Sequence, residues 1–266
     1  MIKNFTPKSL LVVLISASLI VGCSDDNDDV ALNKCFVTKS TSTYSYPGSS
    51  NNSVDDVAFS YNSDNQVIKT VYTSTFNGDT NSSTSVLTYD AKGNLVKQES
   101  EDYTTEYTYN SDNKVIKEDG FEDNILNDRY EYEYNSSGQL IKTQQYRISQ
   151  DGSTATKNGY TTYEYANTTT KNPIRSKSFS QDGLTLLSTT EFEYDDKKTP
   201  LSALQLGTIS AESENNVTKQ TYKNSNTTEL TTYTYEYNEK GYPVKVTESD
   251  LSNGSTTIDI YTYDCK

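Results

Sequence analysis

Tyrosine and threonine alternate with charged residues along much of the chain after residue 35. The stretches "YEYEY" from Tyr130, "TYTYEY" from Thr232 and "EFEY" from Glu191 each repeat with a period of two. This period is typical of β-strands with one face toward a core. No apolar pattern of helical spacing persists between residues 35 and 266. We therefore predict an all-β domain.

A nine-residue unit recurs at the ends of these strands. It reads "YNSDNQVIK" from Tyr61, "YDAKGNLVK" from Tyr89, "YNSDNKVIK" from Tyr109, "YNSSGQLIK" from Tyr134 and "YNEKGYPVK" from Tyr237. An Asn or Asp after the Tyr, with Gly or Asn three positions later, indicates a type I turn followed by a residue at positive φ. Such a turn closes a β-hairpin with a bulge. The residues expected at positive φ are Asn65, Gly93, Asn113, Gly138 and Gly241.

Hairpin geometry then predicts which side chains face each other. The first pairs are Tyr61 with Val67, Tyr89 with Leu95, Tyr109 with Val115, Tyr134 with Leu140 and Tyr237 with Pro243. The next pairs on the same face match Phe59, Leu87, Tyr107, Tyr132 and Tyr235 with Lys69, Lys97, Lys117, Lys142 and Lys245. A Lys stem can lie over an aromatic ring while its ammonium reaches water. We expect these lysines to cover the aromatic rings with their stems while their ammonium groups stay in water. The alternative is that the row of lysines binds a ligand.

Two tips depart from the unit. The segments "ANTTTKNP" after Tyr165 and "DDKKTP" after Tyr194 are longer and end in Pro173 and Pro200, which indicates wider loops. The segments at the opposite ends of the strands, such as "FNGDTNSS" and "SQDGSTATKNG", are polar and contain glycine, as connecting loops do. Two arms for every hairpin give about 14–18 strands of ordinary length.

Residues 1–22 have the pattern of a secretory signal. Lys3 and Lys8 precede the apolar run "LLVVLISASLI", which is too short to span a bilayer, since that takes about 20 residues. The run ends in "IVGC", which resembles a bacterial lipobox, in which the cysteine is lipidated and becomes the new N-terminus. We predict lipidation of Cys23 and thus an outer-membrane lipoprotein; an ordinary signal peptide with a chance Cys is the alternative.

Residues 23–34 are predicted to form an acidic, disordered tether. The run "SDDNDD" after Cys23 consists of like charges that repel and stay solvated. It also resembles the tag that routes some lipoproteins to the cell surface. We therefore expect a lipid-anchored protein of the outer membrane that faces the cell exterior.

Composition excludes several functions. The chain has a net charge of −14, which becomes −16 when Lys3 and Lys8 leave with the signal; this argues against a nucleic-acid partner. There is no His, the commonest general base and a usual zinc ligand. No nucleophile elbow, P-loop, zinc-protease or EF-hand spacing is present. We expect no enzyme activity, metal or cofactor. A catalytic pair of carboxylates is the one alternative, and solvated surface charge explains the acidic residues better than such a pair does.

The cysteines constrain the topology. Apart from Cys23, the chain has Cys35 and Cys265, an even pair in an oxidising compartment, and we predict that they form a disulfide; two free thiols are the alternative. An open row of hairpins would hold these residues tens of ångströms apart, at about 4.8 Å per strand. A closed sheet brings them together and removes both sheet edges. We predict one up-and-down barrel over residues 35–266, with an open, single-layer curved sheet as the alternative.

The unit Tyr89, Asp90, Gly93, Leu95 is similar to the YD repeat of Rhs-type surface proteins, in a looser and irregularly spaced form. Together with the lipobox, the acidic run and the Tyr-rich hairpins, the mature chain resembles a family of secreted lipoproteins of unknown function from gut and environmental Gram-negative bacteria. The resemblance covers residues 35–266 and implies a porin-like β-barrel. It supplies no catalytic or binding residues.

We expect a non-catalytic binding role, with membrane contact through the lipid and a carbohydrate or protein ligand on a Tyr-rich face. The ligand-binding residues are not specified by the sequence. A structural or interaction protein of the envelope, without a small-molecule site, is the alternative. A lipid-facing barrel needs an apolar outer band, whereas Lys, Glu, Asp and Thr occur on both faces of these strands. We therefore expect the barrel to stand outside the bilayer.

Overall fold

The computed structural model describes residues 34–48, 53–200 and 213–265. The signal 1–22, Cys23 and all of the tether but Lys34 lie outside the described residues. Within them the chain forms sixteen β-strands and no α-helix. The strands are β1 (Cys35–Ser45), β2 (Ser53–Tyr61), β3 (Val67–Phe76), β4 (Asp79–Tyr89), β5 (Leu95–Glu99), β6 (Tyr103–Tyr109), β7 (Val115–Glu122), β8 (Ile125–Tyr134), β9 (Leu140–Ile148), β10 (Ala155–Tyr165), β11 (Pro173–Phe179), β12 (Leu186–Lys198), β13 (Asn215–Asn224), β14 (Thr228–Tyr237), β15 (Pro243–Asp250) and β16 (Thr256–Cys265).

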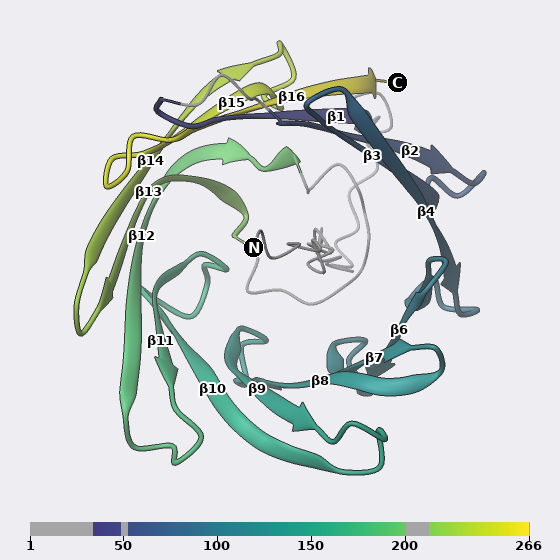
Figure 1. The fold of residues 1–266 in the computed structure, drawn as a ribbon, viewed down its shortest axis with the longest axis vertical. Coiled ribbons are helices and arrows are strands. Elements are labelled where there is room, and N and C mark those ends of the chain that lie inside the picture. The colour runs from purple at the N-terminus through teal and green to yellow at the C-terminus, as the bar shows by residue number, and fades with distance from the viewer. Residues whose placement is uncertain (1–33, 49–52, 201–212, 266) are drawn as a thin grey trace, which may run out of the picture.

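The strands form one closed, antiparallel, up-and-down barrel. Each strand pairs with its neighbours in sequence, and β1 pairs with β16 from Cys35–Cys265 to Ser45–Thr256. Figure 1 shows the strands as a ring seen along its axis. The all-β prediction, the strand range and the closed topology are confirmed, and the open curved sheet is wrong.

All five repeated units form the predicted tips. Positive φ occurs at Asn65, Gly93, Asn113, Gly138 and Gly241. In the first tip the amide of Asn65 donates to the carbonyl of Asn62 over 3.1 Å, and the side-chain oxygen of Asn62 accepts from the amides of Asp64 and Gln66. The Asn or Asp after each Tyr is therefore the residue that organises the turn, and Gly or Asn supplies the left-handed conformation.

The opposite ends of the hairpins use other turns. Asn77 and Gly78 both have positive φ, as do Asp123 and Asn124. Two consecutive residues of this kind form the tight turn whose twist matches that of two paired strands. The repeated tips and the other loops thus lie at opposite ends of the barrel. We use the name narrow end for the end with the repeated tips and wide rim for the end with the other loops. In Figure 1 the tips after β8 and β10 turn toward the centre of the ring, whereas the loops after β9 and β11 lie at its periphery.

The predicted Tyr pairs are present in the sheet. They are Tyr61 with Val67, Tyr89 with Leu95, Tyr109 with Val115, Tyr134 with Leu140 and Tyr237 with Pro243. Tyr263 faces Val37 in the same way, although these residues belong to the last and first strands. β1 and β16 therefore form one more copy of the pair, with the disulfide in place of a turn.

The predicted Lys pairs are wrong by one position. Lys69 faces Ser60, not Phe59, because Ile68 is an extra residue that bulges out of β3. The same shift places Lys97, Lys117, Lys142 and Lys245 opposite Thr88, Thr108, Glu133 and Glu236. A shift of one residue moves a side chain to the other face of a sheet. These lysines thus lie on the face opposite their predicted partner rings, which they do not cover. Lys142 instead lies over the ring of Tyr160, with its Nζ 5.2 Å from the ring centroid.

The two unusual tips behave differently. β10 ends at Tyr165, which faces Pro173 at the start of β11, so this tip is a longer loop, as expected. β12 continues past Tyr194 to Lys198, and Tyr194 faces Val217. The connection from β12 to β13 includes residues 201–212, which lie outside the described part of the chain.

Candidate functional site

One face of the sheet carries the buried apolar side chains. Successive residues of a strand point to opposite faces, and the face that holds the repeated tyrosines also holds the core. Because a closed sheet crowds its concave side, we assign this face to the inner wall. The core lies toward the narrow end and consists of Cys35, Val37, Phe59, Val67, Leu87, Leu95, Tyr107, Val115, Tyr132, Leu140 and Tyr242.

A ring of tyrosine hydroxyls follows the barrel wall at the narrow end. Each donates a hydrogen bond of 2.6–2.9 Å to a backbone carbonyl at or near the start of the strand that precedes its own. The donors and acceptors are Tyr61 to Val37, Tyr89 to Val67, Tyr109 to Leu95, Tyr134 to Val115, Tyr165 to Leu140, Tyr194 to Pro173, Tyr235 to Val217 and Tyr263 to Pro243. We call these eight residues the tyrosine collar.

The collar has a local cause. Between neighbouring hairpins the backbone pairing stops before the tip: β3 and β4 last pair at Lys69 and Val86. The carbonyl of Val67 lies beyond that point, and an unpaired buried carbonyl is costly. The hydroxyl of Tyr89 reaches it over 2.7 Å. Burial raises the pKa of the collar tyrosines, that of Tyr165 to about 12, so each hydroxyl keeps its proton.

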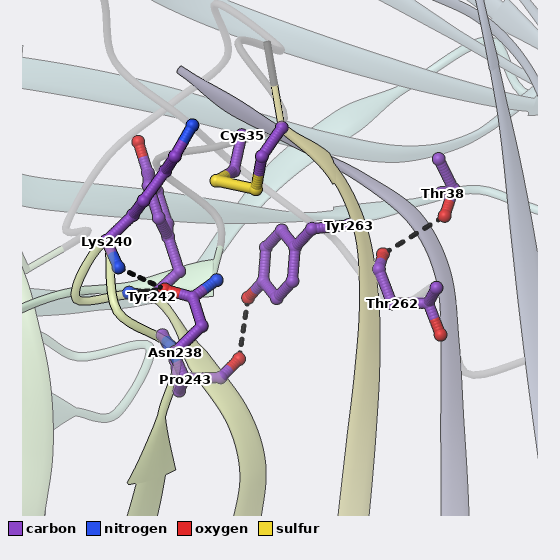
Figure 2. Close-up of a disulfide and its surroundings, with 9 residues drawn as sticks. Cys35, Thr38, Asn238, Lys240, Tyr242, Pro243, Thr262 and Tyr263 are labelled. Atoms are coloured by element: carbon purple, nitrogen blue, oxygen red, sulfur yellow. Dashed lines mark hydrogen bonds between the residues drawn. A yellow bond between two sulfur atoms is a disulfide. The ribbon is translucent and has the colours of Figure 1, made fainter. Parts of the chain in front are cut away.

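The disulfide lies in this collar. Cys35 and Cys265 are bonded, as predicted, across 230 residues of sequence. Figure 2 shows Tyr263 beside the disulfide, with its hydroxyl on the carbonyl of Pro243. Asn238 lies at the adjacent tip and accepts from the amides of Lys240 and Tyr242.

The collar is irregular at β12–β14. The hydroxyl of Tyr235 donates to the carbonyl of Val217, although Tyr237, not Tyr235, is the first residue of the repeated unit in this hairpin. Tyr237 instead donates to the carboxylate of Asp195, which also accepts from the side chain of Asn216. Asn216 is buried. Sequence reasoning missed this cluster, because Asp195 and Tyr237 are brought together only by the extension of β12.

A glycine shapes the inner wall in its middle part. A Cβ on Gly120 would lie 1.9 Å from the hydroxyl oxygen of Tyr103, so the tyrosine ring lies across this position. The ring thereby reaches β8, where the hydroxyl donates to Asp128 over 2.9 Å. Nothing in the local sequence around Gly120 indicates this contact.

A buried carboxyl group lies beside that tyrosine. Glu118 is only 6% exposed and accepts a hydrogen bond from the hydroxyl of Tyr132 over 3.0 Å. Burial raises the pKa of Glu118 to about 6; the Tyr132 bond opposes this, and the negative charges of Asp128 and Asp119 add to it. The expectation that the acidic residues are solvated charge is wrong for Glu118.

More acidic groups face inward near β1 and β16. Ser42 donates to Asp259 over 2.5 Å, and Ser74 donates to Asp55 over 2.6 Å. Burial raises the pKa of Asp259, and burial together with the charges of Asp259 and Asp250 raises that of Glu248. Half-buried tyrosines lie on the same wall between the collar and the wide rim: Tyr44, Tyr72, Tyr103, Tyr130, Tyr233 and Tyr261.

The outer wall is charged. Lys142 pairs with Glu133, Lys245 with Glu236, and Arg175 bridges Glu164 and Glu191. The buried carboxylate of Asp119 accepts from both Arg129 and Lys117, which holds its pKa below the ordinary value despite burial. In the described strands this wall therefore carries ion pairs, which water stabilises better than lipid does.

The described residues hold no group of three or more His, Cys, Asp or Glu side chains that could bind a metal ion. No helix in this part of the chain is long and apolar enough to cross a membrane.

Comparison with known proteins gives the fold class. No family model and no curated protein matches the chain. A porin-like protein from Bacteroides uniformis ATCC 8492 has a similar structure, with 14% identity and a TM-score of 0.61 over 86% of this chain and 96% of that one. A porin-like protein from Bacteroides vulgatus ATCC 8482 is similar at 10% identity and a TM-score of 0.59, over 87% and 99% of the two chains. The chain thus has the fold of porin-like barrels, and identities this low show the fold alone.

Proposed function

We propose that the protein is a lipid-anchored envelope protein that binds a neutral, hydroxyl-rich ligand, such as a glycan, on the inner wall of its barrel. The observation that carries this proposal is the set of half-buried inner-wall tyrosines interleaved with Asp55, Asp128 and Asp259. Aromatic rings with a few polar groups are what ligand sites in concave surfaces present. Barrels of about 16 strands also enclose more width than their side chains fill.

The anchor follows from Cys23 and the outer wall. The ion pairs of that wall favour a barrel in water, so attachment to the membrane is assigned to the lipidated cysteine. Cys23 stands twelve positions before Cys35, a reach of at most about 40 Å for an extended chain. The narrow end, where β1 begins, is therefore held near the outer membrane, and the acidic run after Cys23 supports display on the cell surface.

The binding is proposed to be non-catalytic. Glu118 is the described carboxyl group with a pKa near neutrality, the property of a general acid. It is buried and accepts a hydrogen bond from the hydroxyl of Tyr132. We therefore assign Glu118 a structural role in the inner wall.

Glycan-array binding by a soluble 30–266 fragment, which contains all sixteen strands, tests the ligand. We expect binding to neutral polysaccharides, lost about tenfold or more in Tyr72→Ala with Tyr233→Ala, since each stacked ring contributes about 0.5–1.5 kcal/mol. Tyr46→Ala, on the wide rim, is the matched control. Silence across the array would end the carbohydrate proposal, and release of free sugar would contradict the non-catalytic one.

A second role is favoured by the tyrosine collar. Its eight hydroxyls are all used within the protein, which makes the narrow end a rigid structural element rather than a site. If neutral glycans do not bind, a structural or interaction role in the envelope is the better account.

The anchor has its own test. Cys23→Ala should release the protein from the membrane fraction, and protease added to intact cells should degrade the wild-type protein if it faces the exterior. Retention of the Cys23→Ala variant in the membrane would contradict the lipid anchor.

A further inference from the structure

The wide rim differs in charge from the rest of the barrel. We define it by the described residues of the loops at that end and their flanks, 46–48, 76–79, 100–102, 122–125, 149–155, 180–187, 224–229 and 250–255. Within these ranges there is no Lys or Arg. There are nine carboxylates, all exposed except the half-buried Asp250: Asp79, Glu101, Asp102, Glu122, Asp123, Asp151, Asp182, Glu229 and Asp250.

Turn formation does not account for this charge. Asp182 caps its loop by accepting from the amides of Leu184 and Thr185, two and three positions later. Asn224 does the same for Asn226 and Thr227 in another loop of the rim. A neutral Asn therefore suffices for the turn, as it does at four of the five repeated tips of the narrow end, and the carboxylate adds a charge that the fold does not need.

The hydrogen bonds of these turns keep the carboxylates ionised. Bonds from Ser149 and Ser153 lower the pKa of Asp151 to about 2, and bonds from Ser180, Leu184 and Thr185 lower that of Asp182. Both aspartates thus remain charged well into the acidic range.

The wide rim also exposes large apolar side chains. They come from five of its eight loops and their flanks: Tyr46, Phe76, Ile125, Leu184, Leu186, Leu187 and Leu251. Leu184 is 86% exposed at the tip of the β11–β12 loop, which lies at the periphery of the ring (Figure 1). Exposed apolar side chains set among polar ones are typical of interaction surfaces.

We propose that the wide rim is a docking surface for a polypeptide that carries Lys or Arg beside apolar side chains. Charge complementarity selects this occupant: a ring of loops that carries nine carboxylates and, within the ranges given above, no Lys or Arg attracts a cationic partner and repels an acidic one. A second copy in a rim-to-rim arrangement would oppose like charges, and an anionic lipid surface would be repelled. The exposed leucines supply the apolar contacts that make such an encounter specific.

The probe is a short synthetic peptide of alternating Lys and Leu, titrated into the full mature protein in detergent by fluorescence anisotropy. Two control peptides replace Lys by Glu or Leu by Ser. We expect the Lys–Leu peptide to bind, the Glu–Leu peptide not to bind, and the Lys–Ser peptide to bind about tenfold more weakly or worse. Binding of the Lys–Leu peptide should weaken steeply as salt is added.

Matched variants locate the site. The combination Glu101→Gln, Asp102→Asn, Glu122→Gln and Asp123→Asn should weaken binding about tenfold or more, because four carboxylates leave the rim. The control removes four carboxylates from the narrow end: Asp64→Asn, Asp112→Asn, Asp196→Asn and Glu239→Gln. Leu184→Ser with Leu251→Ser tests the apolar part, against Ile68→Ser with Ile260→Ser on the outer wall.

The proposal predicts losses in the two rim variants and unchanged binding in both controls. It is overturned if the Lys–Leu peptide does not bind, if the narrow-end variant loses as much as the rim variant, or if the Lys–Ser peptide binds equally well. Binding of phosphatidylcholine vesicles through Leu184 and Leu251 would instead identify the rim as a lipid contact. A dimer that Leu184→Ser dissociates would identify it as a contact between copies.

Discussion

The narrow end and the wide rim of the barrel are made by the same strands but use different side chains. At the narrow end, buried tyrosine hydroxyls cap backbone carbonyls, and four lysines stand among five carboxylates in the described loops. At the wide rim, nine carboxylates have no lysine or arginine among them, and leucines such as Leu184 are exposed. The tyrosine hydroxyls of the narrow end all form hydrogen bonds within the protein, whereas the wide rim presents carboxylates and apolar side chains to solvent.

Residues that stabilise the fold therefore gather at the narrow end, and residues available for recognition gather at the wide rim. The repeated unit occurs only at the narrow end of the described barrel. Each copy there forms a tight turn and supplies a tyrosine hydroxyl to a carbonyl that the sheet leaves unpaired. The loops of the wide rim share no such constraint, so their residues are available for contacts with other molecules.

The largest expected effect is on the closure of the narrow end. Cys35→Ser removes a disulfide that spans 230 residues, and loss of such a bond typically costs about 2–5 kcal/mol. We expect a lower melting temperature under non-reducing conditions, and the same loss in the wild-type protein after reduction. An unchanged melting temperature would contradict the role of this bond.

The turns of the narrow end are the next test. Gly138→Val forces a β-branched residue into a φ of +77°, at a cost of about 1–3 kcal/mol. Ser136→Val in the same turn has no such requirement and should cost less, as measured by urea denaturation. Equal losses would show that the turn does not depend on its left-handed residue.

Between the two ends, Glu118 gives a pH-dependent effect. Its pKa is about 6 in the folded protein, against an ordinary 4.5, so the folded state holds the proton more tightly than the unfolded state. Stability from this group is therefore present below pH 4.5 and is lost as the pH rises from 4.5 through 6, by about 2 kcal/mol. Glu118→Gln should remove that part of the slope in urea denaturation at pH 4.5 and 7. A parallel pH dependence in the variant would mean that Glu118 is not the group responsible.

The smallest effect compares single hydroxyl groups at the two ends. Tyr89→Phe leaves the carbonyl of Val67 without its 2.7 Å donor and should cost about 1–2 kcal/mol. Tyr46→Phe on the exposed rim should change the free energy of unfolding by less than about 0.5 kcal/mol. If the two variants lose the same amount, the collar does not stabilise the narrow end.

Much of the fold could be predicted from the sequence because its signals are local. The left-handed positions such as Gly93, and pairs such as Tyr109 with Val115, follow from one turn and its two arms. Closure followed from Cys35 and Cys265. The face of Lys69 was predicted wrongly, because the extra residue Ile68 has no sequence signal separate from an ordinary strand residue.

The site was less predictable because it depends on how neighbouring hairpins are staggered. The bond from Tyr235 to Val217 joins two hairpins whose relative shift is not encoded in either. The same holds for Gly120 beneath Tyr103. The acidic rim did have a signal, the absence of Lys and Arg from alternate loops, but it becomes visible only once the loops are assigned to one end.

Peptide mapping of the oxidised protein tests the closed barrel most directly. After proteolysis without reductant, the account predicts one disulfide-linked pair of peptides, one with Cys35 and one with Cys265, within a single chain. Free thiols at both positions, or a bond between two chains, would contradict a barrel whose first and last strands are paired.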